Sequence, residues 1–175
     1  MSSVTDSRRT VFEKLALEIQ KPDPLVIEFG CASAPNLAVV KIAKPEAYVV
    51  GVDVSAKALK SAKELFEETF KQGGFLFTEH ICKADRADLV IFDRVLYCLP
   101  AWEIMAVLRR FKNAKTVVID DFYAAPPVRG KYDAQDYSGF MWDLGFRVRS
   151  LEKSQYPIAS PFHAEHAKIG IFERP

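Results

Sequence analysis

Acidic residues accompany several apolar segments of this chain, at positions where they could bind a ligand. Glu28 lies in the apolar run LVIEF, and Asp53, Asp93 and Asp120 end the runs YVVGVD, ADLVIFD and TVVID. Ionised carboxylates accept hydrogen bonds from ammonium and hydroxyl groups. Acids in this pattern therefore suit a ligand that has a cationic end and a ribose diol.

The stretch VIEFGCASAPN, residues 26–36, turns directly after Glu28. A dinucleotide-binding loop needs the spacing G-x-G-x-x-G, but the two later glycine positions counted from Gly30 hold Ala32 and Pro35. A phosphate-binding P-loop fits less well, because no G-K-S/T follows the run. S-adenosylmethionine is a ligand that has both a cationic end and a ribose diol.

The composition is that of one globular domain, which we expect to cover residues 1–175. The chain is 49% hydrophobic and 27% charged, and no segment is long and apolar enough to span a membrane. Basic residues are dispersed among acids, so no dedicated nucleic-acid surface is evident. The polar start, MSSVTDSRR, lacks the apolar region of a secretory signal and predicts a cytoplasmic protein. Cys31, Cys82 and Cys98 lack disulfide or zinc spacing, so we expect them to pack.

Apolar periodicity predicts alternating helices and strands. An N-terminal helix within residues 1–22 should precede a core over residues 25–175. Within the core, helices are expected over residues 35–44, 56–72, 102–111 and 133–144, with Pro35 in the first turn of one and Ser55 capping another. The expected strands are LVIEF, YVVGVDVS, GGFLFTEHI, ADLVIFD, TVVID, FRVRSLE and KIGIFE.

This alternation predicts a doubly wound α/β fold with a mainly parallel sheet covered on both faces. Few residues separate the third and fourth strands, so the crossover between them should be shortened. The last two strands, with no helix expected between them, should form an antiparallel hairpin at one edge. Ligands of such sheets bind beyond the carboxyl ends of the strands, which is where most of the acids would gather.

The order and spacing of these segments resemble those of the class I S-adenosylmethionine-dependent methyltransferases, over residues 25 to 173. The resemblance is carried by VIEFGCASA against the family's E/D-x-G-x-G-x-G loop, and by VVGVDVSAKALKSAKE, ADLVIFDRVLYCLP and DYSGFMWDLGFRVRSLE. It implies a seven-stranded sheet in the order 3-2-1-4-5-7-6 with strand seven antiparallel. It also implies methyl transfer from S-adenosylmethionine.

The resemblance assigns roles to residues of the loop and the strand ends. Glu28 would support the methionine end of the cofactor, the backbone from Gly30 to Ala34 would lie along it, and Asp53 would bind both ribose hydroxyls. The turn over residues 79–82 would lie near adenine, whose acidic contact is either Glu79 or Asp85. The cofactor-binding set expected from this is Glu28, Gly30, Cys31, Ala32, Asp53, Val54, Asp93 and Arg94.

Two alanines stand where the family carries glycine. A methyl group is tolerated at negative φ but is penalised at positive φ or where a ligand approaches the backbone closely. We expect Ala32 to be compatible with the loop and Ala34 to be less so.

Methyl transfer from a sulfonium mainly requires alignment of the nucleophile and exclusion of water, so a base is needed only for acceptors such as phenols, hydroxyls or protonated amines. His163 and His166, in SPFHAEHAK, are the candidate bases. The alternatives are a surface loop, or a metal pair if Asp120, Asp121 or Glu165 converged on them. As neighbours on a strand, Asp120 and Asp121 would share a site only if the strand had ended.

Aromatic residues flank the loop after the fourth strand. Tyr97 and Trp102 either wall an acceptor pocket or pack in the core. The same loop begins FDRV and lacks the N/D-P-P-Y/F signature that the family uses on planar amino groups. Methylation of nucleobase amino groups is therefore disfavoured. With only a short N-terminal helix and no inserted domain expected, the pocket of a methyltransferase would suit a small-molecule acceptor or a surface supplied by a partner. The alternatives are a noncatalytic methyltransferase-like subunit that acts through a partner protein, and a different nucleotide-binding α/β protein.

Overall fold

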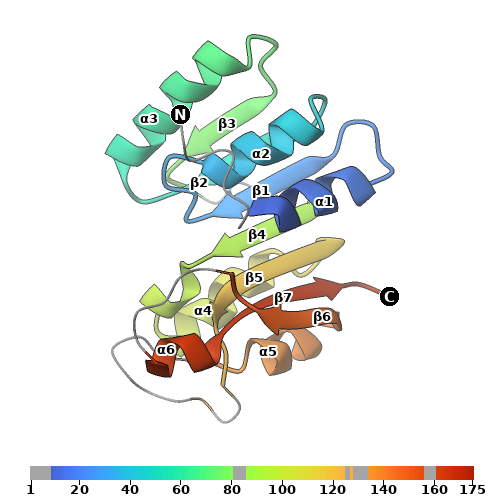
Figure 1. Ribbon diagram of the computed structural model, residues 1–175, viewed down its shortest axis with the longest axis vertical. Coiled ribbons are helices and arrows are strands. Elements are labelled where there is room, and N and C mark those ends of the chain that lie inside the picture. The colour runs from blue at the N-terminus through green and yellow to red at the C-terminus, as the bar shows by residue number, and fades with distance from the viewer. Residues whose placement is uncertain (1–8, 81–85, 125–126, 128–133, 156–160) are drawn as a thin grey trace.

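Seven strands form a single sheet in the order β3-β2-β1-β4-β5-β7-β6 (Figure 1). The computed structural model describes residues 9–80, 86–124, 127, 134–155 and 161–175, and only the backbone of residues 161–163. The strands are β1 (Leu25–Phe29), β2 (Tyr48–Val52), β3 (Phe75–Thr78), β4 (Leu89–Asp93), β5 (Thr116–Phe122), β6 (Arg147–Lys153) and β7 (Ala167–Glu173).

The first five strands run parallel, and β7 runs antiparallel to both β5 and β6. The predicted strand order is confirmed. Since β1 to β5 are parallel, their carboxyl ends share one edge of the sheet, and β7 begins at that same edge with Ala167 paired to Phe122. We call this the carboxyl edge.

Helices cover both faces of the sheet and define two cores. On one face lie α1 (Thr10–Glu18), α2 (Pro35–Ala43) and α3 (Ala56–Thr69). The other face is covered by α4 (Ala101–Arg110) and α5 (Tyr137–Asp143). A one-turn 3-10 helix, η2 (Leu96–Cys98), and a short helix, α6 (Pro161–His166), lie near the end of β5. None of the helices in the described part of the chain is both long and apolar enough to cross a membrane.

Local signals in the sequence account for several helix boundaries. Pro35 is the first residue of α2, where its missing N–H costs nothing. The Ser55 hydroxyl accepts a hydrogen bond from the N–H of Ala58 at 3.3 Å and caps α3 as expected. No helix lies between β3 and β4 among the residues described there, in line with the predicted short crossover.

Two helix predictions were wrong. α5 begins at Tyr137 rather than at residue 133, because Asp136 caps it by accepting a hydrogen bond from the N–H of Gly139 at 2.9 Å. Just before that cap, Gln135 bridges to Tyr123 in an extended conformation. The last two strands are also separated by α6, which begins at Pro161.

The expectation that all three cysteines pack is only partly met, and of the two interpretations given for Trp102 the core one fails. Cys31 is buried, whereas Cys98 is exposed, and Cys82 lies outside the described residues. Trp102 is 74% exposed, because it lies in the first turn of α4 on the side away from the sheet. The core interpretation of Trp102 was therefore wrong.

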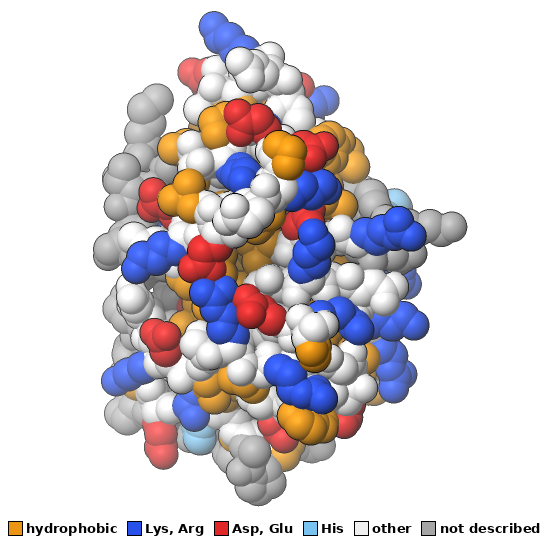
Figure 2. Space-filling model, turned by 90° about the vertical axis from the view of Figure 1, so that its right-hand side faces the viewer, with side chains coloured by type: hydrophobic (Ala, Val, Ile, Leu, Met, Phe, Trp, Pro, Cys, Tyr) orange, Lys and Arg blue, Asp and Glu red, His pale blue; other side chains and the backbone are white. Residues whose placement is uncertain are grey.

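The edge of the sheet opposite the carboxyl edge carries interspersed acidic and basic side chains (Figure 2). A hollow of about 270 Å³ lies there, between α1 and the starts of β4 and β5. Its buried acid, Asp88, accepts bonds from Lys115 at 2.7 Å, Lys21 at 3.1 Å and the N–H of Leu25 at 2.9 Å. Burial acts to raise the pKa of Asp88, but these bonds together hold it below its usual range. The negative charge of Asp88 is thus balanced by Lys21 and Lys115. Its hydrogen bond to Leu25 holds the start of β1 beside the start of β4.

Candidate active site

The loop after β1 is fastened to the end of β2. Gly30 and Cys31 both donate their N–H to the carbonyl of Val52, at 2.7 and 3.1 Å. Gly30 has a φ of 76°, and a Cβ added to it would lie 2.7 Å from the Cβ of Val95, so the loop packs against the chain that follows β4. Burial raises the pKa of the Cys31 thiol, which keeps it protonated as a packing group.

The two alanines of the loop adopt backbone conformations that normally favour glycine. Ala32 has a φ of 48° and Ala34 a φ of 58°. The loop therefore keeps the positive φ angles that are typical of glycine-rich loops. At each alanine this left-handed conformation costs about 1–2 kcal/mol of folding free energy relative to a right-handed one. Ala34 is fully buried and partly offsets this cost by packing, whereas Ala32 is exposed.

Removing the strain at Ala32 is expected to stabilise the protein. The variant Ala32→Gly should raise the free energy of unfolding by about 0.5–1 kcal/mol, because glycine adopts positive φ without penalty. Ala58→Gly, in the right-handed backbone of α3, is the matched control and should lower it by about 0.5–1 kcal/mol. Urea unfolding of the three proteins measures both changes. A loss of stability in Ala32→Gly would contradict the explanation.

Asp53 follows β2 directly and its carboxylate is oriented by two backbone groups. Oδ2 accepts from the N–H of Ala32 at 2.8 Å, and Oδ1 accepts from the N–H of Ser55 at 2.8 Å. Asp53 is half-buried, while the next residue, Val54, is 92% exposed. The acid therefore joins the loop after β1 to the start of α3 and stands at the carboxyl edge.

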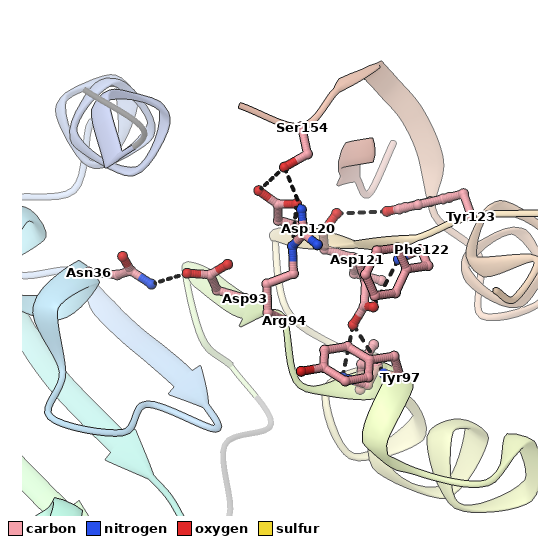
Figure 3. Close-up of polar contacts among 11 residues, drawn as sticks. Asn36, Asp93, Arg94, Tyr97, Asp120, Asp121, Phe122, Tyr123 and Ser154 are labelled. Atoms are coloured by element: carbon pink, nitrogen blue, oxygen red, sulfur yellow. Dashed lines mark hydrogen bonds and ion pairs between the residues drawn. The ribbon is translucent and has the colours of Figure 1, made fainter. Parts of the chain in front are cut away.

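A second acidic group lies where β1 meets β4, and an amide joins its members. Glu28 is 2% exposed, and its Oε1 accepts from Nδ2 of Asn36 at 2.6 Å. The same Nδ2 donates to Oδ2 of Asp93 at 2.8 Å, as drawn in Figure 3. Burial raises the pKa of Glu28 well above its ordinary value, and the nearby Asp93 raises it further against the opposing bond from Asn36.

The sequence interpretation did not single out Asn36. Its signal was a polar amide directly after the loop, in the segment PNLAVVKIA, which is apolar apart from Asn36 and Lys41. The side chain is 2% exposed, and its Oδ1 accepts from Nε of Arg9 at 2.9 Å. A buried amide whose hydrogen-bonding groups are used in this way has one defined orientation.

These residues fit S-adenosylmethionine. Oε2 of Glu28 is buried and has no hydrogen-bond partner among the described residues, which leaves a desolvated acceptor at the place expected for a cationic methionine end. Asp53 presents a carboxylate at the place expected for a ribose diol. In the loop after β1, Gly30 has no side chain and the exposed Ala32 has only a methyl group, so a ligand can approach the backbone closely.

Arg94 connects the end of β4 to β5 and β6 (Figure 3). Its Nε lies 3.3 Å from Oδ1 of Asp120, and its Nη2 donates to the Ser154 hydroxyl at 2.8 Å. That hydroxyl in turn donates to Oδ2 of Asp120 at 3.1 Å, and the guanidinium lies 4.9 Å from the centre of the Phe122 ring. Arg94 has a φ of 55°, which directs its side chain toward this cluster and away from Asn36.

Known proteins resemble this chain in sequence and in fold. No protein-family model matches the chain. It is 29% identical over 144 residues to thiocyanate methyltransferase 1 of Brassica oleracea, covering 75% of this chain and 62% of that protein. It is also 29% identical over 158 residues to thiocyanate methyltransferase 1 of Arabidopsis thaliana, covering 83% of this chain and 67% of that protein. The chain thus spans about two thirds of the length of these relatives.

A solved structure of magnesium protoporphyrin IX methyltransferase from Synechocystis PCC 6803, with bound S-adenosylmethionine, superposes on 97% of this chain and 78% of that one. The TM-score is 0.72 at 20% sequence identity. The chain therefore has the fold of the class I S-adenosylmethionine-dependent methyltransferases.

In this methyltransferase fold, Asp120 and Asp121 have separate surroundings because β5 continues through both. Asp121 accepts from the N–H groups of Leu96 at 3.0 Å, Tyr97 at 3.2 Å and Phe122 at 2.8 Å, so it caps η2. Asp120 faces Arg94 instead. The two acids therefore form no shared site. Burial raises the pKa of Asp120 to about 6 and that of Asp121 to about 7.

These pKa values predict that the protein loses stability as the pH rises. A carboxyl with a higher pKa in the folded state than in the unfolded state stabilises the fold while protonated, and this contribution is lost as the pH passes the folded pKa. The free energy of unfolding should fall by about 1–3 kcal/mol between pH 5 and pH 8. Urea unfolding at several pH values measures it, and Asp121→Asn should flatten the fall between pH 6 and pH 8. A constant or rising stability over this range would contradict the prediction.

Two of the predicted catalytic residues lie beside this cluster. The Tyr97 ring packs edge-on against Phe122, with ring centres 5.4 Å apart. His166 ends α6, where its Nδ1 lies 3.0 Å from the carbonyl of Tyr123. Since a carbonyl only accepts, Nδ1 carries the proton in this contact, and Nε2 is the basic nitrogen of the neutral ring.

Two further predictions concern this region, namely His163 as a base and a metal site as its alternative. The side chain of His163 lies outside the described residues. Among those that are described, no group of three or more His, Cys, Asp or Glu side chains could hold a metal ion. At the carboxyl edge, the residues predicted to bind the cofactor therefore lie at the ends of β1, β2 and β4, whereas Tyr97 and His166 lie near the end of β5 and the start of β7.

Proposed function

We propose that this chain is a methyltransferase that binds S-adenosylmethionine at the carboxyl edge and transfers its methyl group to a small-molecule acceptor. The observation that carries the proposal is the pairing of the β1 loop with Asp53. The loop keeps its left-handed course, and its Ala32 N–H orients the carboxylate that would bind the ribose hydroxyls.

The cofactor, when bound, supplies an electrophilic methyl group on a sulfonium. Glu28 and Asp93 would receive its methionine end, the backbone of Gly30, Cys31 and Ala32 would lie along it, and Asp53 would hold its ribose. Val54, exposed beside Asp53, would border the adenine. The backbone of Arg94 follows Asp93 at the methionine portion, while its side chain is held by Asp120 and Ser154.

The acceptor would enter from the side of β5 and β7, where Tyr97 and His166 lie. Tyr97 would form a wall of this side through its contact with Phe122. His166, whose Nδ1 is held by the Tyr123 carbonyl, would take a proton at Nε2 from an acceptor that needs deprotonation. His163, four residues before Ala167, is the second candidate base.

Thiocyanate is the first acceptor to test, because the two relatives are named for it. As a small anionic nucleophile it requires alignment and exclusion of water rather than a base. Methylation of thiocyanate would therefore proceed in His166→Ala as in the wild type, whereas methylation of a phenol or hydroxyl would not.

The test is calorimetric titration with S-adenosylmethionine and S-adenosylhomocysteine, followed by turnover with thiocyanate and a panel of small thiols and phenols. We expect micromolar binding and formation of S-adenosylhomocysteine with at least one acceptor. Absence of binding to the folded protein would favour the noncatalytic subunit that acts through a partner protein.

A further inference from the structure

Asn36 holds together two acids that come from neighbouring strands. Glu28 belongs to β1 and Asp93 ends β4, and Nδ2 of Asn36 donates to one oxygen of each, at 2.6 and 2.8 Å. Glu28 and Asn36 are both 2% exposed, so water screens the acids only weakly. Burial and the nearby Asp93 raise the pKa of Glu28, so a cation beside the pair would favour the ionised form of Glu28.

The chemical nature of the bridge matters as much as its position. A lysine or arginine at this place would itself neutralise the acids, whereas a neutral amide supplies two N–H donors and leaves the acids able to bind a cation from outside. Oε2 of Glu28 is buried with no hydrogen-bond partner among the described residues. The group therefore retains a desolvated acceptor next to negative charge, which is suited to a cation.

Arg9 determines which way the amide faces. Its Nε donates to Oδ1 of Asn36 at 2.9 Å, so the carbonyl side of the amide is turned to Arg9 and the NH₂ side to the acids. Arg9 immediately precedes α1, which packs against α2. The N-terminal helix thereby contributes to the orientation of a side chain at the carboxyl edge.

We propose that Asn36 is a positioning residue that holds Glu28 and Asp93 together as a receptor for the ammonium group of the cofactor's methionine portion. The inference rests on the proposed function, because it assumes that S-adenosylmethionine binds at this edge. It assigns Asn36 to one part of the cofactor only. The adenosine portion would be bound through Asp53, on the other side of the loop.

Two ligands separate these portions. S-adenosylhomocysteine carries the ammonium group, whereas 5′-methylthioadenosine has the same adenosine and thioether but no amino-acid portion. In calorimetric titration of the full chain, Asn36→Leu should weaken S-adenosylhomocysteine binding about 10- to 100-fold, as expected for loss of hydrogen bonds to charged groups. Binding of 5′-methylthioadenosine should change less than about twofold.

Asn113→Leu is the matched control, because Asn113 lies exposed in the turn after α4 and should leave both affinities unchanged. Asn36→Thr keeps a single donor, so it should weaken S-adenosylhomocysteine binding by an intermediate factor and leave 5′-methylthioadenosine binding unchanged. This variant replaces Asn36→Leu in the test if Asn36→Leu does not fold. Equal losses for both ligands, or no loss for either, would overturn the role of Asn36. A wild type that binds neither ligand would instead overturn the proposed function itself.

Discussion

Asp53→Ala is expected to weaken S-adenosylmethionine binding about 100-fold. The carboxylate of Asp53 stands at the end of β2, where it would accept hydrogen bonds from both ribose hydroxyls, and bonds to a charged group contribute about 1.5–3 kcal/mol each. The substitution also removes the acceptor for the N–H groups of Ala32 and Ser55, at 2.8 Å each, so the loop after β1 loses its connection to α3. Both effects weaken the same site.

Calorimetric titration measures this loss, with two variants as controls. Asp53→Asn keeps one acceptor oxygen and should weaken binding less, by about 10-fold. Glu64→Ala removes an exposed acid from α3 and should leave the affinity unchanged. If Asp53→Ala bound the cofactor as well as Glu64→Ala does, the ribose assignment of Asp53 would be wrong.

Gly30→Ala is expected to lower the free energy of unfolding by about 2–5 kcal/mol. The residue combines two constraints: a φ of 76°, which costs an L residue about 1–2 kcal/mol, and close packing against Val95, where overpacking typically costs about 1–3 kcal/mol. An added Cβ would lie 2.7 Å from the Cβ of Val95. Because Val95 belongs to the chain after β4, the loop after β1 would have to move away from β4.

Two other glycines separate the constraints. Gly73 has a φ of 71° and no atom of the described residues within 4 Å of an added Cβ, so Gly73→Ala should show the backbone cost alone, about 1–2 kcal/mol. At Gly51 an added Cβ would lie 2.6 Å from the Phe77 ring and 2.7 Å from Sγ of Cys31, so Gly51→Ala should show overpacking alone, about 1–3 kcal/mol. Urea unfolding compares the three. If Gly30→Ala lowered the free energy of unfolding by no more than Gly73→Ala does, Val95 would have moved aside for the added methyl group. The overpacking predicted at Gly30 would then be wrong.

The central strands β1, β2, β4 and β5 were predictable because each is a short apolar run that is largely buried within the sheet. The exposed edge strand β6 was recognised only by its place before the last strand. The shortened crossover after β3 was predictable from the few residues available. The start of α5 was not, because it depends on Asp136 as a cap and on the bridge between Gln135 and Tyr123, which pairs residues distant in the chain.

Asp120 and Asp121 illustrate how much of the site follows from local rules. Their opposite directions follow from the alternation of side chains along a strand, and only the end of β5 at Phe122 had to come from the structure. Their partners, Arg94 for one and the backbone of η2 for the other, could not be inferred from adjacency.

The sequence by itself determined which segments form the sheet and that acids stand at its carboxyl edge, since burial and chain polarity are local properties of each run. Only the tertiary structure decided which polar groups meet. Asn36, in the first turn of α2, joins Glu28 to Asp93 because β1 and β4 are neighbours in the sheet. Arg94 meets Asp120 because the ends of β4 and β5 are paired, and Ser154, just after β6, contacts both. Such contacts depend on the register and spacing of distant elements, which no single run of residues encodes.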